Sequence, residues 1–134
     1  MSSFAFAQEQ PLIIDYSTSL GEGGDIGQFL ALQAQLAQSG RRVIVRNECN
    51  SSCTMFLRLR NICAEPGASF LFHAGHKIMN NGQIGAPVPH SMDQMVTNLY
   101  PPRIRAFIIR HGGLKVQPIV LRGAEMRALV PACH

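Results

Sequence analysis

The chain has 134 residues, of which 46% are hydrophobic and 15% are charged, and its formal net charge at pH 7 is +4. The composition is too apolar for a disordered protein, and the length suits one domain with a core of its own. The basic residues are dispersed and no apolar run approaches the ~20 residues of a membrane span, so we expect no nucleic-acid partner and no membrane span.

The first residues resemble the cleavage site of a secretory signal. Ala5-Phe6-Ala7 is a small-x-small triplet and is followed by polar residues 8–10. We interpret residues 1–7 as the remnant of a signal peptide and residues 8–134 as a single domain. The charged start and long apolar core of such a signal are absent, so an ordinary frayed terminus is the alternative. The first interpretation predicts a periplasmic or secreted protein, in which disulfides can form.

The next part of the chain predicts a βαβ unit. Residues 11–16 contain a short apolar run that is typical of a buried strand, and the Ser- and Gly-rich residues 17–24 predict a loop. Asp25 is placed to cap a helix that runs to Ser39, with Gly40 as its left-handed C-cap. Residues 43–45 predict a second buried strand. A strand, a helix and a strand in this order imply parallel pairing and a right-handed crossover.

The pattern continues with short elements. We predict a turn at residues 47–51, a helix at 52–59, a tight turn at 64–67 and a third strand at 70–72 that ends at His73. Residues 75–89 are rich in Gly, Pro and Asn and predict an irregular, mobile segment. Three further helices are expected at residues 91–99, 102–110 and 124–129. The predicted fold class is therefore α/β, with mostly parallel strands, no internal repeat and no second domain.

Four cysteines, Cys49, Cys53, Cys63 and Cys133, lack the paired spacing of a zinc site. In an oxidising compartment an even number of cysteines suggests disulfides, and four cysteines allow three pairings. We favour Cys63 with Cys133, which would tie the C-terminal tail to the body, and Cys49 with Cys53. The alternative is buried thiols that act as small hydrophobic groups. We expect no metal and no cofactor.

Three predicted loops follow the carboxyl ends of strands, where ligands gather in open α/β sheets. They carry Gly23 and Gly24, Ser52 and Cys53, and His73. Ser52 could act as a nucleophile and His73 as its base, while the backbone N–H groups of Cys53 and of Gly23 or Gly24 could form an oxyanion hole. Each residue also has an ordinary interpretation: an N-cap serine, a glycine turn and a hydrogen-bonded core histidine.

These residues carry a resemblance to a known family. A Gly-Gly loop before a helix, Ser-Ser-Cys-Thr at 51–54 and Pro-Gly-Ala followed by a strand and His at 66–73 resemble ClpP/crotonase-like proteins, most closely exported ClpP-type serine peptidases. The resemblance covers residues 12–75 well and 122–130 weakly. It implies a short version of the ClpP/crotonase spiral of βα units, with Ser52 as nucleophile, His73 as base and Gly23, Gly24 and Cys53 as oxyanion donors.

The chain departs from that family where the third catalytic residue is expected. The family has an acid shortly before its last helix, whereas residues 115–121 contain no carboxylate. Without an acid to orient the imidazole, the tautomer of His73 is not controlled and activity should fall steeply. Asp93, Asp25 or Glu125 could substitute as the orienting acid, and a backbone carbonyl or amide could also do so.

Other chemistry-bearing residues rank lower. His76 could be a second imidazole near the site, and His111 fits the C-terminus of a helix. Cys53 could be a thiol nucleophile. Lys77 could be the base of a Ser/Lys dyad, but the position of Lys77 does not match that of the lysine in related signal-peptide peptidases. His73 and His76 lack a third metal ligand.

Three functions follow as expectations. The first is a serine hydrolase that acts on a peptide or protein substrate, and the second is a catalytically weak or inactive relative that binds a peptide or a partner. The third is an acyl-CoA enzyme of the crotonase type, for which the expected catalytic acids are not evident. The resemblance also implies a homo-oligomer. Four apolar residues would suit its interface or the domain's own core: Ile104, Phe107, Ile108 and Ile109.

Overall fold

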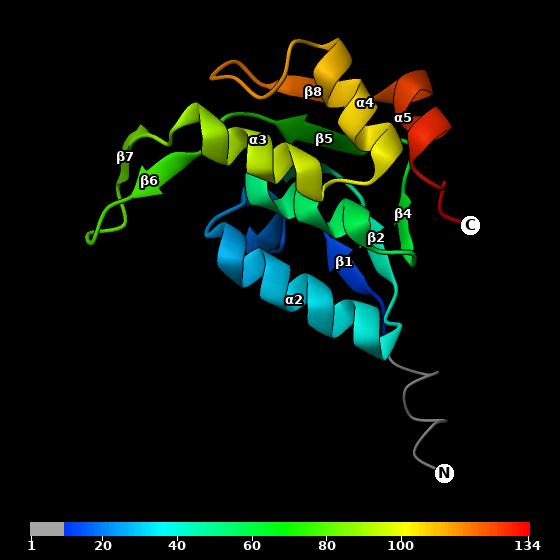
Figure 1. Cartoon of the computed structure of the whole chain (residues 1–134). Coiled ribbons are helices and arrows are strands. Elements are labelled where there is room, and N and C mark those ends of the chain that lie inside the picture. Colours follow the sequence, from blue (N-terminus) through cyan, green and yellow to red (C-terminus); the bar gives the residue numbers. More distant parts are fainter. Residues whose placement is uncertain (1–9) are drawn as a thin grey trace.

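The computed structural model describes residues 10–134 as a mixed α/β fold. The interpreted signal remnant, residues 1–7, lies outside the described residues. In Figure 1, helix α2 (Ile26–Ser39) lies in the lower half of the molecule, and helices α3 (His90–Leu99) and α4 (Pro102–Arg110) lie in the upper half. Small parallel and antiparallel sheets are both present, so the predicted fold class is confirmed at this level.

The predicted βαβ unit forms as expected. Strand β1 (Leu12–Ile14) leads through α2 (Ile26–Ser39) to β2 (Val43–Val45), which pairs with β1 in parallel. The carboxylate of Asp25 accepts a hydrogen bond from the N–H of Gln28 at 3.1 Å and so caps the helix. Gly40 ends it in the left-handed conformation, with φ of 70°. Both predicted caps are confirmed.

Two parallel strands, β3 and β4, form where no strand was predicted from the sequence. Strand β4 (Ile62–Ala64) pairs in parallel with β2 and makes the first sheet β1-β2-β4. Strand β3 (Glu48–Asn50) forms where a turn was predicted, and it pairs in parallel with β5 (Ser69–Phe72). The turn prediction was wrong because only Cys49 of the three β3 residues is buried, so its polar neighbours hide the strand.

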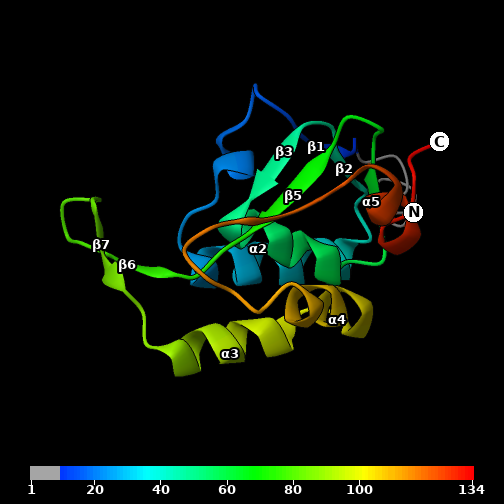
Figure 2. The ribbon, with the colours of Figure 1, turned by 90° about the horizontal axis from the view of Figure 1, so that it is seen from above.

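The second sheet is β3-β5-β8, in which β8 (Ile119–Arg122) runs antiparallel to β5. This strand was not predicted. Its buried and exposed residues alternate as in a sheet with one solvated face. Residues 75–89 also differ from the prediction, since they form a hairpin of β6 (His76–Ile78) and β7 (Ile84–Pro87) that projects from the body (Figure 2).

The predicted helices are present within two residues of their expected bounds. They are α3 (His90–Leu99), α4 (Pro102–Arg110) and α5 (Gly123–Leu129). The helix expected at residues 52–59 is a 3₁₀ helix, η2 (Ser51–Arg58), and a shorter one, η1 (Ser19–Glu22), interrupts the predicted loop 17–24.

Aromatic side chains join the layers in the core. Phe29 of α2 contacts Phe56 of η2, with ring centroids 5.5 Å apart. Phe72, at the end of β5, contacts Tyr100 at 5.4 Å and Phe107 at 5.9 Å, so the helical layer is fixed to the strand that precedes His73. These contacts hold α3 and α4 against the second sheet.

The apolar residues of α4 serve mainly the core of the chain itself. Ile104, Phe107 and Ile108 are buried, whereas Ile109 is 62% exposed. Of the four residues suggested for an oligomer interface, only Ile109 therefore lies on the surface of the described chain. Among residues 10–134, we find no helix with the length and apolar character needed to cross a membrane.

Two disulfides form, with the two pairings that we favoured. Cys63 bonds Cys133 and Cys49 bonds Cys53, and the sequence separations are 70 and 4. The first holds residues 131–133 beside β4, where the N–H of Ala64 donates to Pro131 and the N–H of Cys133 donates to Ala64. Both disulfides are consistent with an oxidising or extracellular compartment.

Candidate active site

Ser52 and His73 leave the sheet at the same edge. Strands β3 and β5 are adjacent and parallel (Figure 2). In their register Asn50 pairs with Leu71. Ser52 and His73 each follow these paired positions by two residues. Because the carboxyl ends of parallel strands meet at one edge, the two side chains start from neighbouring points of the backbone.

The glycine loop packs directly against the turn that carries Ser52. A Cβ added to Gly23 would lie 2.7 Å from the carbonyl oxygen of Asn50, 3.0 Å from Cβ of Ser51 and 3.4 Å from the backbone nitrogen of Ser52. Gly23 also has φ of 84°, a conformation that favours glycine. The predicted meeting of this loop with the Ser52 turn is therefore present.

The hydroxyl of Ser52 is engaged in this structure. Ser52 is 9% exposed, and its Oγ donates to the carbonyl oxygen of Gly24 at 2.6 Å. Among residues 10–134, no hydrogen bond joins Ser52 to His73. Because the carbonyl of Gly24 accepts the Ser52 proton, transfer of that proton to His73 requires the hydroxyl to rotate.

A strained residue precedes the candidate nucleophile. Ser51 has φ of 56° and is the one non-glycine residue with positive φ in the described range 10–134. Such a conformation costs about 1–2 kcal/mol and persists where surrounding contacts hold it. It turns the chain sharply between β3 and η2, and so sets where Ser52 emerges.

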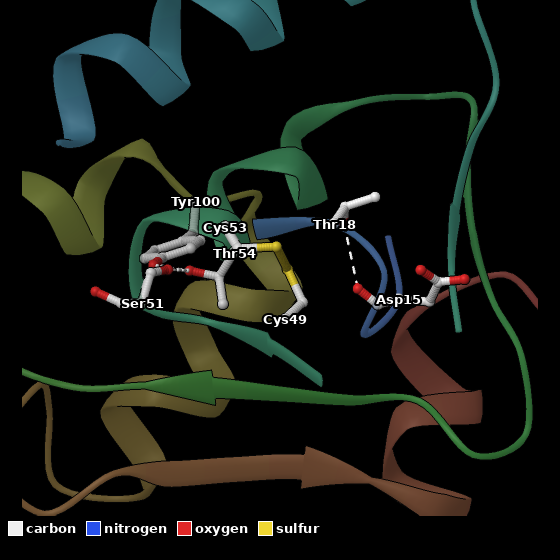
Figure 3. Close-up of a disulfide and its surroundings, with 7 residues drawn as sticks. All are labelled: Asp15, Thr18, Cys49, Ser51, Cys53, Thr54 and Tyr100. Atoms are coloured by element: carbon white, nitrogen blue, oxygen red, sulfur yellow. Dashed lines mark hydrogen bonds between the residues drawn. A yellow bond between two sulfur atoms is a disulfide. The ribbon is translucent and has the colours of Figure 1, made fainter. Parts of the chain in front are cut away.

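Two buried hydroxyls hold that turn (Figure 3). Thr54 Oγ1 donates to the carbonyl of Ser51 at 2.6 Å, and it lies 2.6 Å from the hydroxyl of Tyr100. Because the Thr54 proton goes to Ser51, the Tyr100 hydroxyl must be the donor in the second bond. Burial raises the pKa of Tyr100 to about 12, so this donor keeps its proton through the physiological range.

The disulfide between Cys49 and Cys53 braces the same turn (Figure 3). It links the middle of β3 to the first turn of η2 across the strained residue Ser51. It also removes the thiol-nucleophile alternative for Cys53, because a sulfur in a disulfide is not a free thiolate. The Cys53 side chain is fully buried.

The ring of His73 is held on one side by the chain's own backbone. Its Nδ1 lies 2.8 Å from the carbonyl oxygen of Ala74. A carbonyl oxygen can only accept, so Nδ1 carries the proton of the neutral ring and the lone pair lies on Nε2. This tautomer is the one that a general base acting through Nε2 requires.

The three candidate acids have different partners. Asp25 caps α2, and Glu125 pairs with Arg110 at 3.4 Å and with His111, the C-cap of α4, at 3.6 Å. Asp93 is buried, at 7% exposure, and accepts the backbone N–H of Gly75 at 2.9 Å. Within residues 10–134, no hydrogen bond or ion pair joins any of the three carboxylates to the ring of His73. Only Asp93 contacts the segment that follows His73.

Of the candidate oxyanion donors, one already donates a hydrogen bond within the chain. The N–H of Gly23 donates to the carbonyl of Leu20 at 3.2 Å, whereas the N–H of Gly24 has no acceptor among residues 10–134. Cys53 lies in the first turn of η2, where backbone N–H groups favour negative charge. Of the two glycines, Gly24 is therefore the better candidate donor.

The lower-ranked residues lie on other parts of the fold. His76 and Lys77 belong to the projecting strand β6. A surface hollow of about 530 Å³ lies between α3, α4 and residues 112–114, and Asp93 and His90 are part of its lining. A second, of about 360 Å³, adjoins the Cys63–Cys133 disulfide. Ser52 and His73 line neither hollow.

Sequence reasoning missed the residues that hold the site. Thr54 was part of the Ser-Ser-Cys-Thr motif but was given no role, and Tyr100 was not singled out because a tyrosine before two prolines carries no motif. Asp93 was a candidate, but its contact with Gly75 depends on how α3 folds back over the sheet. Comparison of this chain with protein-family models, curated proteins and solved structures gives no match.

Proposed function

We propose that the protein is a ClpP-like serine hydrolase that cleaves peptide bonds, with Ser52 as nucleophile and His73 as base. The observation that carries this proposal is the parallel register of β3 and β5, with Asn50 opposite Leu71, which brings Ser52 and His73 out at one edge beside the glycine loop. A nucleophile, an imidazole and free amide donors at one edge are the parts of an acyl-transfer site.

The reaction would run in two balanced halves. Ser52 Oγ attacks the substrate carbonyl while His73 Nε2 takes its proton, and the oxyanion is stabilised by backbone N–H groups that include Gly24. Collapse of the tetrahedral intermediate breaks the C–N bond, and His73 returns the proton to the leaving amine. A water molecule then attacks the acyl group on Ser52 while His73 takes one of its protons. The bond between the acyl carbon and Ser52 Oγ breaks, and His73 returns that proton to Oγ as the acid leaves.

Two further features support the proposal. The Ala74 carbonyl fixes the required tautomer of His73, so the absence of a carboxylate from residues 115–121 does not leave the ring without an acceptor. The motifs at residues 23–24, 51–54 and 66–73 resemble those of exported ClpP-type peptidases. That resemblance is also our basis for proposing the short ClpP/crotonase-like spiral, the periplasmic or secreted location and a homo-oligomer.

One observation favours a second candidate function. The Ser52 hydroxyl donates to Gly24 rather than to His73, so in this arrangement its proton is not shared with the base. A non-catalytic relative that binds a peptide or a partner would retain the fold and this hydrogen bond.

Labelling with a fluorophosphonate separates the two functions. We expect covalent modification of Ser52 in the disulfide-bonded protein, found by mass spectrometry of the modified peptide. Ser52→Ala should abolish the label and His73→Gln should slow it by at least about 100-fold, in line with the usual contribution of a general base. Ser91→Ala, on the exposed start of α3, is the matched serine control and should label like the wild type.

In folded protein, the labelling result distinguishes the hydrolase from the binding function. If protein with both disulfides intact shows no label at Ser52 after prolonged exposure, the hydrolase proposal fails and the binding function takes its place. Label that survives Ser52→Ala would show that another residue reacts.

A further inference from the structure

We propose that Asp93 is a positioning residue that orients and polarises His73 through the peptide group between Ala74 and Gly75. This inference rests on the proposed function, because it explains how the base of that site is held. It assigns to Asp93 the role of an acid that acts through the backbone rather than by touching the imidazole.

The geometry is a chain of two hydrogen bonds on one peptide group. His73 Nδ1 donates to the carbonyl oxygen of Ala74 at 2.8 Å. The N–H of Gly75, which belongs to the same peptide group, donates to Asp93 Oδ1 at 2.9 Å. The imidazole and the carboxylate thus bond to the two opposite edges, C=O and N–H, of one peptide group.

That peptide group is fixed by its neighbours as well. The N–H of Ala74 donates to the carbonyl of Lys115 at 2.8 Å, and the carbonyl of Gly75 accepts from the N–H of Val88 at 3.0 Å. All four backbone polar groups of Ala74 and Gly75 are therefore bonded. The carbonyl that holds His73 cannot turn away without breaking several of these bonds at once.

The charge of Asp93 acts through this amide. Asp93 is 7% exposed, and within residues 10–134 no cation forms an ion pair with it. A carboxylate that accepts an amide N–H polarises the amide and makes its carbonyl a stronger acceptor, by roughly 10–30% per bond in a low-dielectric environment. The position of Asp93 in the first turn of α3 also favours a negative charge there.

The consequence for His73 follows from the stronger acceptor. The Ala74 carbonyl holds the proton on Nδ1 and leaves the Nε2 lone pair available to the Ser52 hydroxyl. Neutral imidazole in water prefers the opposite tautomer, so a weak acceptor would leave part of the population with Nε2 protonated and unable to act as a base.

The test measures the tautomer directly. The ¹⁵N chemical shifts of the His73 ring, recorded where the ring is neutral, report which nitrogen carries the proton. We expect the Nδ1–H tautomer to dominate in the wild type and its share to fall at least twofold in Asp93→Asn. Asp25→Asn, in which a carboxylate is neutralised at a helix cap, should leave the His73 shifts unchanged.

A kinetic readout accompanies the spectrum. The rate of fluorophosphonate labelling at Ser52 should fall about tenfold in Asp93→Asn and remain unchanged in Asp25→Asn. If the wild type does not label at all, the proposed function fails, but the tautomer measurement still tests the role of Asp93.

Two results would overturn the inference. One is a wild-type spectrum in which Nε2 carries the proton, which needs no variant and so does not depend on whether Asp93→Asn folds. The other is an unchanged tautomer population in folded Asp93→Asn, which would reduce Asp93 to a structural contact of the 74–75 segment.

Discussion

Gly23 and Asn50 are packed so closely that a methyl group on Gly23 would lie 2.7 Å from the carbonyl oxygen of Asn50. We therefore expect Gly23→Ala to separate the glycine loop from the Ser52 turn. The loss should be about 3 kcal/mol in the free energy of unfolding, measured in urea, because a clash adds to the backbone strain. Labelling at Ser52 should fall as well.

Gly113 provides the matched control for that substitution. It has the same φ of 84°, but no atom lies within 4 Å of an added Cβ. Gly113→Ala should cost about 1 kcal/mol and leave labelling unchanged. Equal effects of the two variants would mean that the contact with Asn50 has no part in positioning the site.

Tyr100→Phe tests the pair of hydroxyls that hold the strained Ser51. Phenylalanine keeps the aromatic packing against Phe72 but removes the hydrogen bond to Thr54. We expect a loss of about 1 kcal/mol at neutral pH and slower labelling of Ser52. A double-mutant cycle with Thr54→Val would measure the interaction energy between the two hydroxyls. Additive effects on the free energy of unfolding would show that the hydrogen bond between them does not contribute.

The same variant predicts how stability depends on alkaline pH. Burial raises the pKa of Tyr100 from 10.0 to about 12, so the folded state holds this proton more tightly than the unfolded chain does. Its contribution is complete below pH 10.0 and is lost as the pH rises toward 12, by on the order of 3 kcal/mol. The difference between wild type and Tyr100→Phe should shrink or reverse over that range in denaturation experiments.

The two disulfides should contribute unequally to stability. Cys63 and Cys133 are 70 positions apart, whereas Cys49 and Cys53 are 4 apart. From the entropy of closing these loops in the unfolded chain, replacing the first pair with alanine should cost about 4 kcal/mol and the second about 2 kcal/mol. If the shorter loop proves more important, its native contacts beside Ser52 outweigh the entropy.

Asp25 should act as a helix cap and not as a catalytic acid. Asp25→Ala removes the acceptor for the N–H of Gln28 and should cost about 1 kcal/mol, whereas Asp25→Asn retains an acceptor and should cost a few tenths. Both variants should label at the wild-type rate. Slower labelling in Asp25→Asn would instead show that the Asp25 carboxylate contributes to the reaction at Ser52.

Elements that depend on neighbouring residues were predicted correctly from the sequence. The run Leu12-Ile13-Ile14, the cap at Asp25 and the glycine at 40 predicted the βαβ unit, because each is a property of neighbouring residues. The meeting of the glycine loop with the Ser52 turn followed from the topology, since parallel strands share their carboxyl edge.

Features that depend on distant contacts could not be predicted. Strand β3 has one buried residue and so lacks a local pattern, whereas the apolar run Ile119-Val120-Leu121 of β8 is a strand signal that our prediction overlooked. The acceptor for His73 is a backbone carbonyl, which every residue has and no motif marks. The contact of Asp93 with Gly75 requires the hairpin to return the chain to the end of β5.

The segment at residues 131–133 has a consequence for solubility. It bonds to both the N–H and the carbonyl of Ala64 and so occupies the free edge of β4, and the Cys63–Cys133 bond keeps it there. A bare strand edge offers its amides to another molecule and starts aggregation. Strong reductants should therefore make concentrated solutions of this protein associate through that edge, even while the rest of each molecule keeps its fold.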